Sequence, residues 1–172
     1  MSCIGLTGFP SDCGANIGGV KKLWIAQLTD VASVTINGQY SHIVDSIAMF
    51  GGARFVEWRI LPGNCSYTVN GSRDDFGVIE WLHTVTVKLN RRLGRPTSII
   101  WDTINGSRDL VCLILDANGN YWLLGWPFGM YLIGEGGSGT NKSDGSTYSM
   151  TFSGESPKME LLISEDDIPN IT

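Results

Sequence analysis

The chain has 172 residues, of which 42% are hydrophobic and 22 are glycine, and its formal net charge is −5 at pH 7. This length and hydrophobic content predict one soluble domain with a sizeable core and no second full domain. The acidic balance argues against a protein that coats nucleic acid, because such proteins need clustered Lys and Arg to neutralise phosphates. With no N-terminal signal pattern and no long apolar run, the chain is expected to be neither secreted nor membrane-spanning.

The first part of the chain predicts an irregular arm followed by short strands. Residues 1–19 are rich in Gly, Ser and Asn and lack periodicity, which is typical of an arm that orders only where it contacts something else. Asn37-Gly38 supplies a tight-turn signal, so a hairpin is expected there. Strands are predicted at 20–28, 35–49 (as this hairpin), 56–60 and 65–69.

A charged stretch and a regular strand follow. Residues 70–77 are rich in turn formers and include Arg73, Asp74 and Asp75, which predicts an exposed loop. Residues 81–89 alternate apolar with polar side chains throughout. This period of two predicts a strand with one buried and one exposed face.

Only one segment has a helical pattern. Thr97 or Ser98 can cap a helix that runs to Ile104, and Asn105-Gly106 supplies a C-terminal cap. A helix this short is not stable alone, so we expect it to be held by packing against a sheet.

The region 110–125 is the strongest hairpin signal in the chain. Two apolar runs rich in β-formers flank Asn118-Gly119, which supplies the positive-φ positions of a tight turn. Neither run alternates with polar residues, so both faces of the hairpin, including Cys112, are expected to be covered. A second sheet, a short helix or another subunit can supply that cover.

The remaining segments predict a loop, two strands and an arm. Residues 134–146 read as a Gly/Ser/Asn loop, and 147–152 and 159–164 as strands. The acidic tail 165–172 contains Pro169 and is expected to be an extended arm. The fold class is therefore mainly β, an antiparallel sandwich or barrel of about seven to nine strands with one short flanking α-helix. Its predicted units are an N-terminal arm (1–19), a β-domain (20–164) and a C-terminal arm (165–172).

Two motif matches fail on their context. The spacing G-x-G-x-x-G occurs at 134–139, but no helix that could hold a pyrophosphate follows, and Lys142 is misplaced for a phosphate-binding loop. Asp116, Asn118 and Asn120 occupy the first positions of a calcium loop, but the required later Gly and Glu are missing. Turn chemistry explains these residues better than ligand binding does.

No catalytic or metal-binding constellation is evident, so no cofactor, metal or enzymatic activity is expected. His42 and His83 each lie in a predicted strand, where a lone histidine is more often a hydrogen-bonded packing residue than a base. The cysteines are far apart, which argues against disulfides and zinc sites. They are Cys3, Cys13, Cys65 and Cys112.

One basic cluster stands out in an otherwise acidic chain. It consists of Lys88, Arg91, Arg92 and Arg95. It is either a solvated corner or a surface that binds an acidic neighbour, such as another copy of the chain.

Three segments in their order carry a resemblance to a known family. The segments are Gly-Gly-Val-Lys-Lys-Leu-Trp-Ile-Ala-Gln at 18–27, Trp-Leu-His-Thr-Val-Thr-Val-Lys-Leu-Asn at 81–90 and Leu-Ile-Leu-Asp-Ala-Asn-Gly-Asn-Tyr-Trp-Leu-Leu-Gly at 113–125. Together with the predicted short helix, they resemble tail-tube virion proteins of bacteriophages, particularly of phages with Bacteroides-like hosts. The resemblance covers most of 16–164. It implies a β-domain with a flanking helix, six copies in a ring, rings stacked into a DNA conduit, and no catalytic motif.

The expected function is therefore that of a virion structural protein, a tail-tube or tail-ring component made in the host cytoplasm and found in the tail. Its expected partners are other copies of itself, other tail or portal proteins, and passing DNA that it does not bind tightly. The first alternative function is a carbohydrate-binding or adhesin sandwich, which the aromatic content suggests. A small hydrolase is the alternative ranked last. The candidates for contacts between subunits are Arg73, Asp74, Asp75, Lys88, Arg91, Arg92 and Arg95. The candidates for the lumen are acidic, because a polyanion must slide past them: Asp74, Asp75, Asp144, Glu155 and Asp167.

Overall fold

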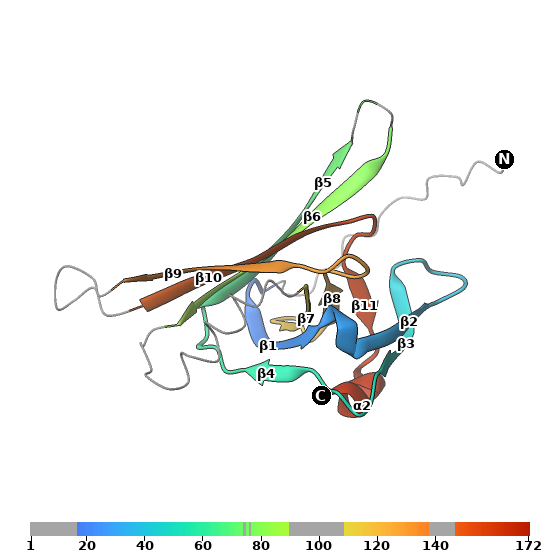
Figure 1. Cartoon of the computed structure of the whole chain (residues 1–172), viewed down its shortest axis with the longest axis horizontal. Helices are drawn as coiled ribbons and strands as arrows, with labels where there is room; N and C mark the ends of the chain where they lie inside the picture. The colour runs from blue at the N-terminus through green and yellow to red at the C-terminus, as the bar shows by residue number, and fades with distance from the viewer. Residues whose placement is uncertain (1–16, 74, 76, 90–108, 138–146) are drawn as a thin grey trace.

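The computed structural model describes residues 17–73, 75, 77–89, 109–137 and 147–172, which form two packed β-sheets (Figure 1). The larger sheet has seven strands in the order β2 (Val31–Ile36), β3 (Ile43–Met49), β11 (Leu161–Ile163), β8 (Tyr121–Leu124), β7 (Leu110–Asp116), β1 (Val20–Gln27) and β4 (Val56–Trp58). The smaller sheet has four strands in the order β5 (Cys65–Arg73), β6 (Ile79–Leu89), β10 (Thr147–Ser156) and β9 (Tyr131–Gly137). Short helical turns are η1 (Leu28–Asp30), η2 (Glu165–Asp167) and α2 (Ile168–Ile171).

The predicted mainly-β sandwich is confirmed, and the sheets do not close into a barrel. The described residues hold eleven strands, more than the predicted seven to nine. All strand pairs are antiparallel except β11 with β3, which is parallel. The predicted helix at 97–104 lies outside the described residues.

Strand β7 is buried on both faces, as the hairpin pattern predicted. Leu110, Cys112 and Ile114 point into the core between the two sheets, whereas Val111 and Leu113 point into a second core on the far side of the larger sheet. The Asn118-Gly119 turn joins β7 to β8, and Gly119 adopts a φ of 95°. Each fully buried aliphatic side chain contributes about 2 kcal/mol through removal from water.

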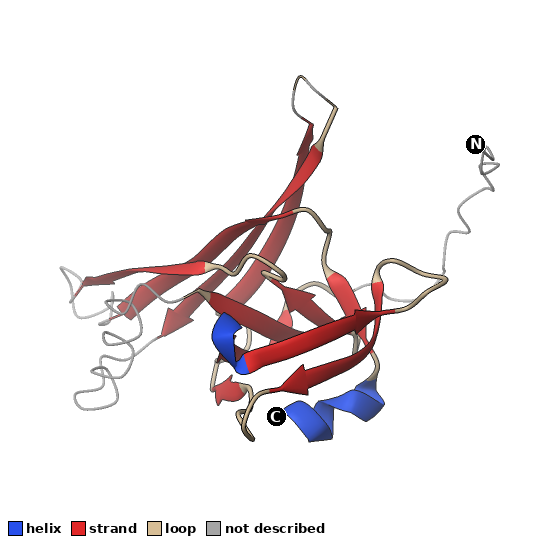
Figure 2. Cartoon of the chain, turned by 45° about the vertical axis from the view of Figure 1, so that its right-hand side comes forward, coloured by secondary structure: helices blue, strands red, loops and turns tan. Residues whose placement is uncertain are grey.

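The C-terminal tail closes the second core, so the prediction of an extended arm at 165–172 is wrong. Ile168 and Ile171 of α2 are both buried. The carbonyl of Ile171 accepts a hydrogen bond from the Phe55 amide at 2.8 Å. Pro169 is compatible with this helix because it lies in the first turn, where no amide donor is needed. Figure 2 shows the turn packed beneath the larger sheet, beside the C-terminus.

Two predicted loops are strands. The first half of the segment 70–77, predicted as a loop, continues β5 as far as Arg73 and forms a hairpin with β6. The first part of the predicted loop 134–146 belongs to β9. Both segments are rich in Gly, Ser and Asn because they extend beyond the core, so no apolar period marks them.

Candidate functional site

The four-stranded sheet covers the inter-sheet core with one face and leaves its other face open. Val85, Val87, Met150 and Phe152 point inward and are buried. Because side chains alternate along a strand, their neighbours point outward. The outward set is dominated by hydroxyls that are exposed or half-exposed: Ser66, Thr68, Thr84, Thr86, Ser149, Thr151 and Ser153. Ser66, Thr86 and Thr151 face one another across three strands, which makes a continuous neutral polar surface, here called the hydroxyl face.

The charges on the hydroxyl face are few and mostly acidic. Glu155 is exposed at one end of β10, whereas Lys88 is exposed at the other end of the sheet, beside Ser149. Glu80 on β6 and Glu135 on β9 also point outward on this face and are exposed. One base against three acids gives this surface little attraction for phosphates.

The structure does not bring the candidate lumen residues together. Glu155 lies on the hydroxyl face, but Asp167 lies in η2, next to the second core. These two residues therefore do not share one surface. Asp144 and Asp74 lie outside the described residues, and Asp75 is exposed in the β5–β6 turn.

Both edges of the four-stranded sheet are open among the described residues. Strand β5 pairs with β6 and β9 pairs with β10, and neither has a second partner. Natural edge strands are usually blunted by Lys or Pro, and neither residue occurs in β5 or β9. In β9 the side chains of Tyr131 and Ile133 are 55% and 52% exposed. Apart from Glu135 near its end, this edge therefore lacks a charge that would oppose pairing with another chain.

The β5–β6 hairpin extends past the body of the sandwich as an arm (Figure 1). Gly71 and Trp81 face each other in it, and a Cβ at Gly71 would lie 2.8 Å from the Trp81 ring. The glycine therefore lets the indole pack flat against the backbone of the arm. Arg73 and Asp75 are exposed near its tip, and their role in contacts between subunits stays a prediction.

An acidic cleft borders the β5 edge. It has a volume of about 370 Å³, and its lining includes Tyr67, Asp116 and Glu160. The Oε2 atom of Glu160 is buried and has no hydrogen-bond partner among the described residues. The cleft therefore places two carboxylates, those of Asp116 and Glu160, beside the Tyr67 ring.

A second hollow lies at the other edge, where β9 begins. It measures about 440 Å³ and is lined by Leu82, Asp109, Phe128, Gly129, Tyr131, Gly154 and Glu155. Phe128 is 64% exposed, and a Cβ at Gly154 would collide with the Gly129 carbonyl oxygen. The glycines therefore bring the 126–130 turn down onto β10.

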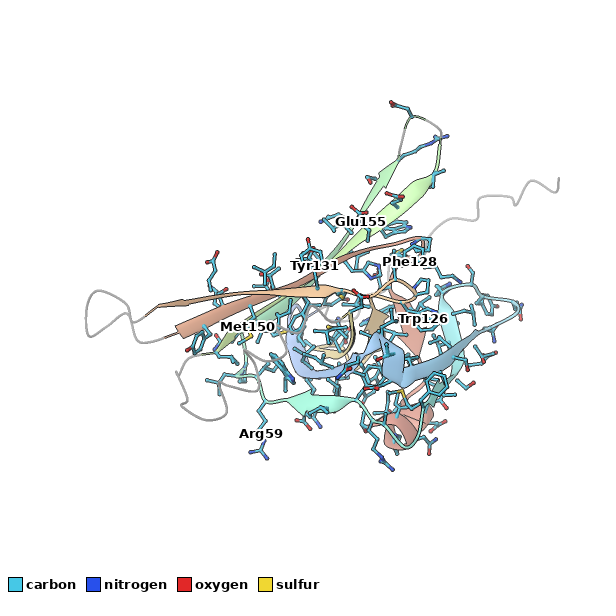
Figure 3. All side chains as sticks on the ribbon, viewed as in Figure 1. Arg59, Trp126, Phe128, Tyr131, Met150 and Glu155 are labelled. Atoms are coloured by element: carbon cyan, nitrogen blue, oxygen red, sulfur yellow. The ribbon has the colours of Figure 1, made fainter. Side chains whose placement is uncertain are left out.

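Figure 3 shows Phe128, Tyr131 and Glu155 on the same side of this sheet, with Arg59 on the opposite side of the molecule. We call this the aromatic–acidic hollow; only Glu155 among its residues was a sequence candidate.

Of the basic cluster, only Lys88 lies within the described residues. Lys88 is exposed at the end of β6, whereas Arg91, Arg92 and Arg95 lie outside the described residues. Their proposed contact with an acidic neighbour therefore stays a prediction.

His83 is a packing residue, as its isolation in a strand indicated. Its Nδ1 accepts a hydrogen bond from the Gly125 amide at 3.0 Å, and its Nε2 lies 2.9 Å from the Lys158 carbonyl oxygen. These partners fit the neutral ring with its proton on Nε2. Burial lowers the pKa of His83 below its ordinary value, although the bond to Lys158 acts in the opposite direction. His42 lies in a turn before β3, so its predicted place in a strand is wrong.

Asp116 organises the β7–β8 turn, which supports the turn interpretation over a calcium loop. Its carboxylate accepts hydrogen bonds from the amides of Asn118 and Asn120 and from the Trp122 indole at 2.9 Å. Burial alone would raise the pKa of Asp116, but these hydrogen bonds together lower it below its ordinary value. The carboxylate is therefore occupied in holding the hairpin closed.

The described cysteines are packing residues as well. Cys65 and Cys112 are free thiols in the inter-sheet core. Burial raises the pKa of Cys65 to about 12 and raises that of Cys112 also, so both thiols stay protonated at neutral pH. Within the described ranges, no group of His, Cys, Asp and Glu is arranged to hold a metal ion.

Comparison with known protein families, with curated protein sequences and with solved structures finds no match to this chain. In the part of the chain that the structure describes, no helix is both long and apolar enough to span a bilayer.

Proposed function

We propose that this protein is a non-enzymatic structural subunit of a bacteriophage tail, a tube or ring component that assembles with copies of itself through the edges of its four-stranded sheet. The observation that carries the proposal is a sheet whose two edges and polar outer face have no partner among the described residues. The sequence resemblance to tail-tube virion proteins agrees with this arrangement and implies six copies per ring.

The direction of the strands favours a closed ring. All pairs in the four-stranded sheet are antiparallel, so the two edge strands β5 and β9 run in opposite directions. When copies stand side by side, β9 of one therefore meets β5 of the next in antiparallel register, and one sheet continues through both. Such a contact joins two different surfaces, and contacts of this type close into rings when the rotation allows.

The hydroxyl face suits the wall of a DNA conduit. A continuous sheet through the ring would present this face to one side, and on the concave side it would line the channel. Serine and threonine hydroxyls with a slight acidic excess hold a polyanion weakly, so DNA can slide past. Of the candidate lumen residues, Glu155 fits this role and Asp167 does not.

Substitution at the β9 edge tests the proposal. Ile133→Lys introduces a charge where β5 of the next copy would pair, and we expect it to abolish assembly while leaving the subunit folded. Thr151→Lys is the matched control, because it adds the same charge in the same cross-strand row but on the central strand β10. Light scattering and negative-stain images of the purified protein should show rings or tubes for the wild type and the control only. A wild type that stays monomeric at high concentration would refute the proposal.

A carbohydrate-binding module is the second candidate. Its motive was the content of six tryptophans and five tyrosines. None of the described tryptophans is exposed, whereas Tyr40 and Tyr131 are. Its remaining support is the aromatic–acidic hollow, where Phe128 and Tyr131 offer open ring faces. A monosaccharide panel measured by ligand-observed NMR, with Tyr131→Ala as the control, separates this candidate from self-assembly.

A further inference from the structure

The aromatic–acidic hollow has the chemistry of a receptor for a cation. Phe128 and Tyr131 are exposed rings beside two exposed carboxylates, Asp109 and Glu155. Ring faces and carboxylates both attract an ammonium or guanidinium group. Leu82 supplies an apolar wall against which the methylene stem of a long basic side chain can lie.

The hollow and the exposed lysine of the same sheet lie at opposite ends of the strands. Glu155 is opposite Leu82, whereas Ser149 is opposite Lys88. The six residue steps from Ser149 to Glu155 correspond to about 20 Å along β10. A lysine side chain cannot span that distance, so Lys88 does not reach the hollow of its own chain. Two copies placed end to end along the strand direction would bring these two regions together.

We infer that the aromatic–acidic hollow binds the Lys88 end of a second copy, with the Lys88 ammonium entering between the Phe128 and Tyr131 rings and the Asp109 and Glu155 carboxylates. The inference rests on the proposed function and adds a head-to-tail contact along the strands to the side-by-side contact of β5 with β9. The side-by-side contact closes a ring, and the head-to-tail contact stacks one ring on the next. Because it joins unlike surfaces, it can repeat without limit, as a tube requires.

A charge swap tests this contact. Glu155→Lys and Lys88→Glu should each lower the association constant between rings about fivefold, because each places like charges together. The double variant should recover most of the loss, since it restores opposite charges in exchanged positions. Glu57→Lys is the matched control, because it reverses an exposed carboxylate on β4 of the larger sheet, outside both the hollow and the Lys88 end. Sedimentation velocity at low salt, with images to count rings and stacks, gives the readout.

The outcomes separate the two proposals. Intact rings that stack poorly in both single variants and well in the double variant support the contact. Rings that stack equally in all variants would overturn it and leave the proposed function standing. A wild type that forms no rings would overturn both. If Arg73→Glu alone reduces stacking, the arm tip is the occupant, and the assignment to Lys88 is wrong. If the protein binds a sugar, Tyr131→Ala abolishes that binding and the charge swap leaves stacking unchanged, then the hollow is a carbohydrate site and the inferred contact is wrong.

Discussion

Strands β7 and β10 both lie inside a sheet, between two paired neighbours, but they differ in what covers their second face. β7 packs into a core on each side, and no residue of it is exposed. β10 packs Met150 and Phe152 into a core on one side and leaves Thr151 and Ser153 partly exposed on the other. The larger sheet thus holds the doubly covered part of the core, whereas the smaller sheet supplies the face and the two edges that we propose contact other copies.

Removing a side chain from β7 should have the largest effect on stability. Leu113 has no exposed surface, so Leu113→Ala leaves a cavity and should lower the free energy of unfolding by about 4 kcal/mol. Thr151→Ala on the open face of β10 should change it by less than about 0.5 kcal/mol. Urea denaturation of both variants measures the difference. Similar losses in the two variants would remove the distinction between the sheets.

The C-terminal turn should behave as part of the stabilising region. Ile171 is 2% exposed in the second core, and Ile171→Ala should lower the free energy of unfolding by about 3 kcal/mol. If the tail were a free arm, the variant would match the wild type in the same denaturation experiment. Assembly of the folded fraction should be unaffected, because the turn is far from the β5 and β9 edges.

A smaller effect on stability should come from His83, which makes the free energy of unfolding depend on pH. His83 has a lowered pKa when folded, so between that value and about 6.5 the unfolded chain binds more protons than the folded one. Stability should therefore fall as the pH drops from 7 to 5, with a slope of at most about 1.4 kcal/mol per pH unit from this group. His83→Gln, which stays neutral, should lose this component. Asp116 does not interfere, because its contribution is lost only at pH values below its ordinary pKa.

The smallest expected effect concerns DNA. The hydroxyl face carries Lys88 against three glutamates, so the free protein should give no measurable shift of duplex DNA at physiological salt. A gel-shift assay checks this. Micromolar or tighter binding would contradict a sliding surface and favour a protein that grips DNA.

Sequence patterns predicted the buried elements of this fold well and the exposed ones poorly. The hairpin around Asn118-Gly119 was predictable because burial on both faces leaves two apolar runs and the turn leaves its own signature. β9 and the arm end of β5 gave no such pattern, because a strand that packs against little has no apolar period. The tail was misread because two buried isoleucines three residues apart are too few to reveal a helix against an acidic background.

The aromatic–acidic hollow was beyond sequence analysis for a different reason. Asp109, Phe128 and Glu155 come from distant segments that only the strand register brings together. Glu155 was chosen for its charge, and nothing in the sequence paired it with an aromatic ring.

Amide hydrogen exchange on assembled and unassembled protein tests edge pairing most directly. We expect the amides of β5 and β9 that point away from β6 and β10 to exchange at least about tenfold more slowly after assembly, because these donors then bond to the neighbouring copy. Amides of β6 and β10, which are already paired, should change little. An assembly in which β5 and β9 exchange as fast as in the free subunit would contradict the account.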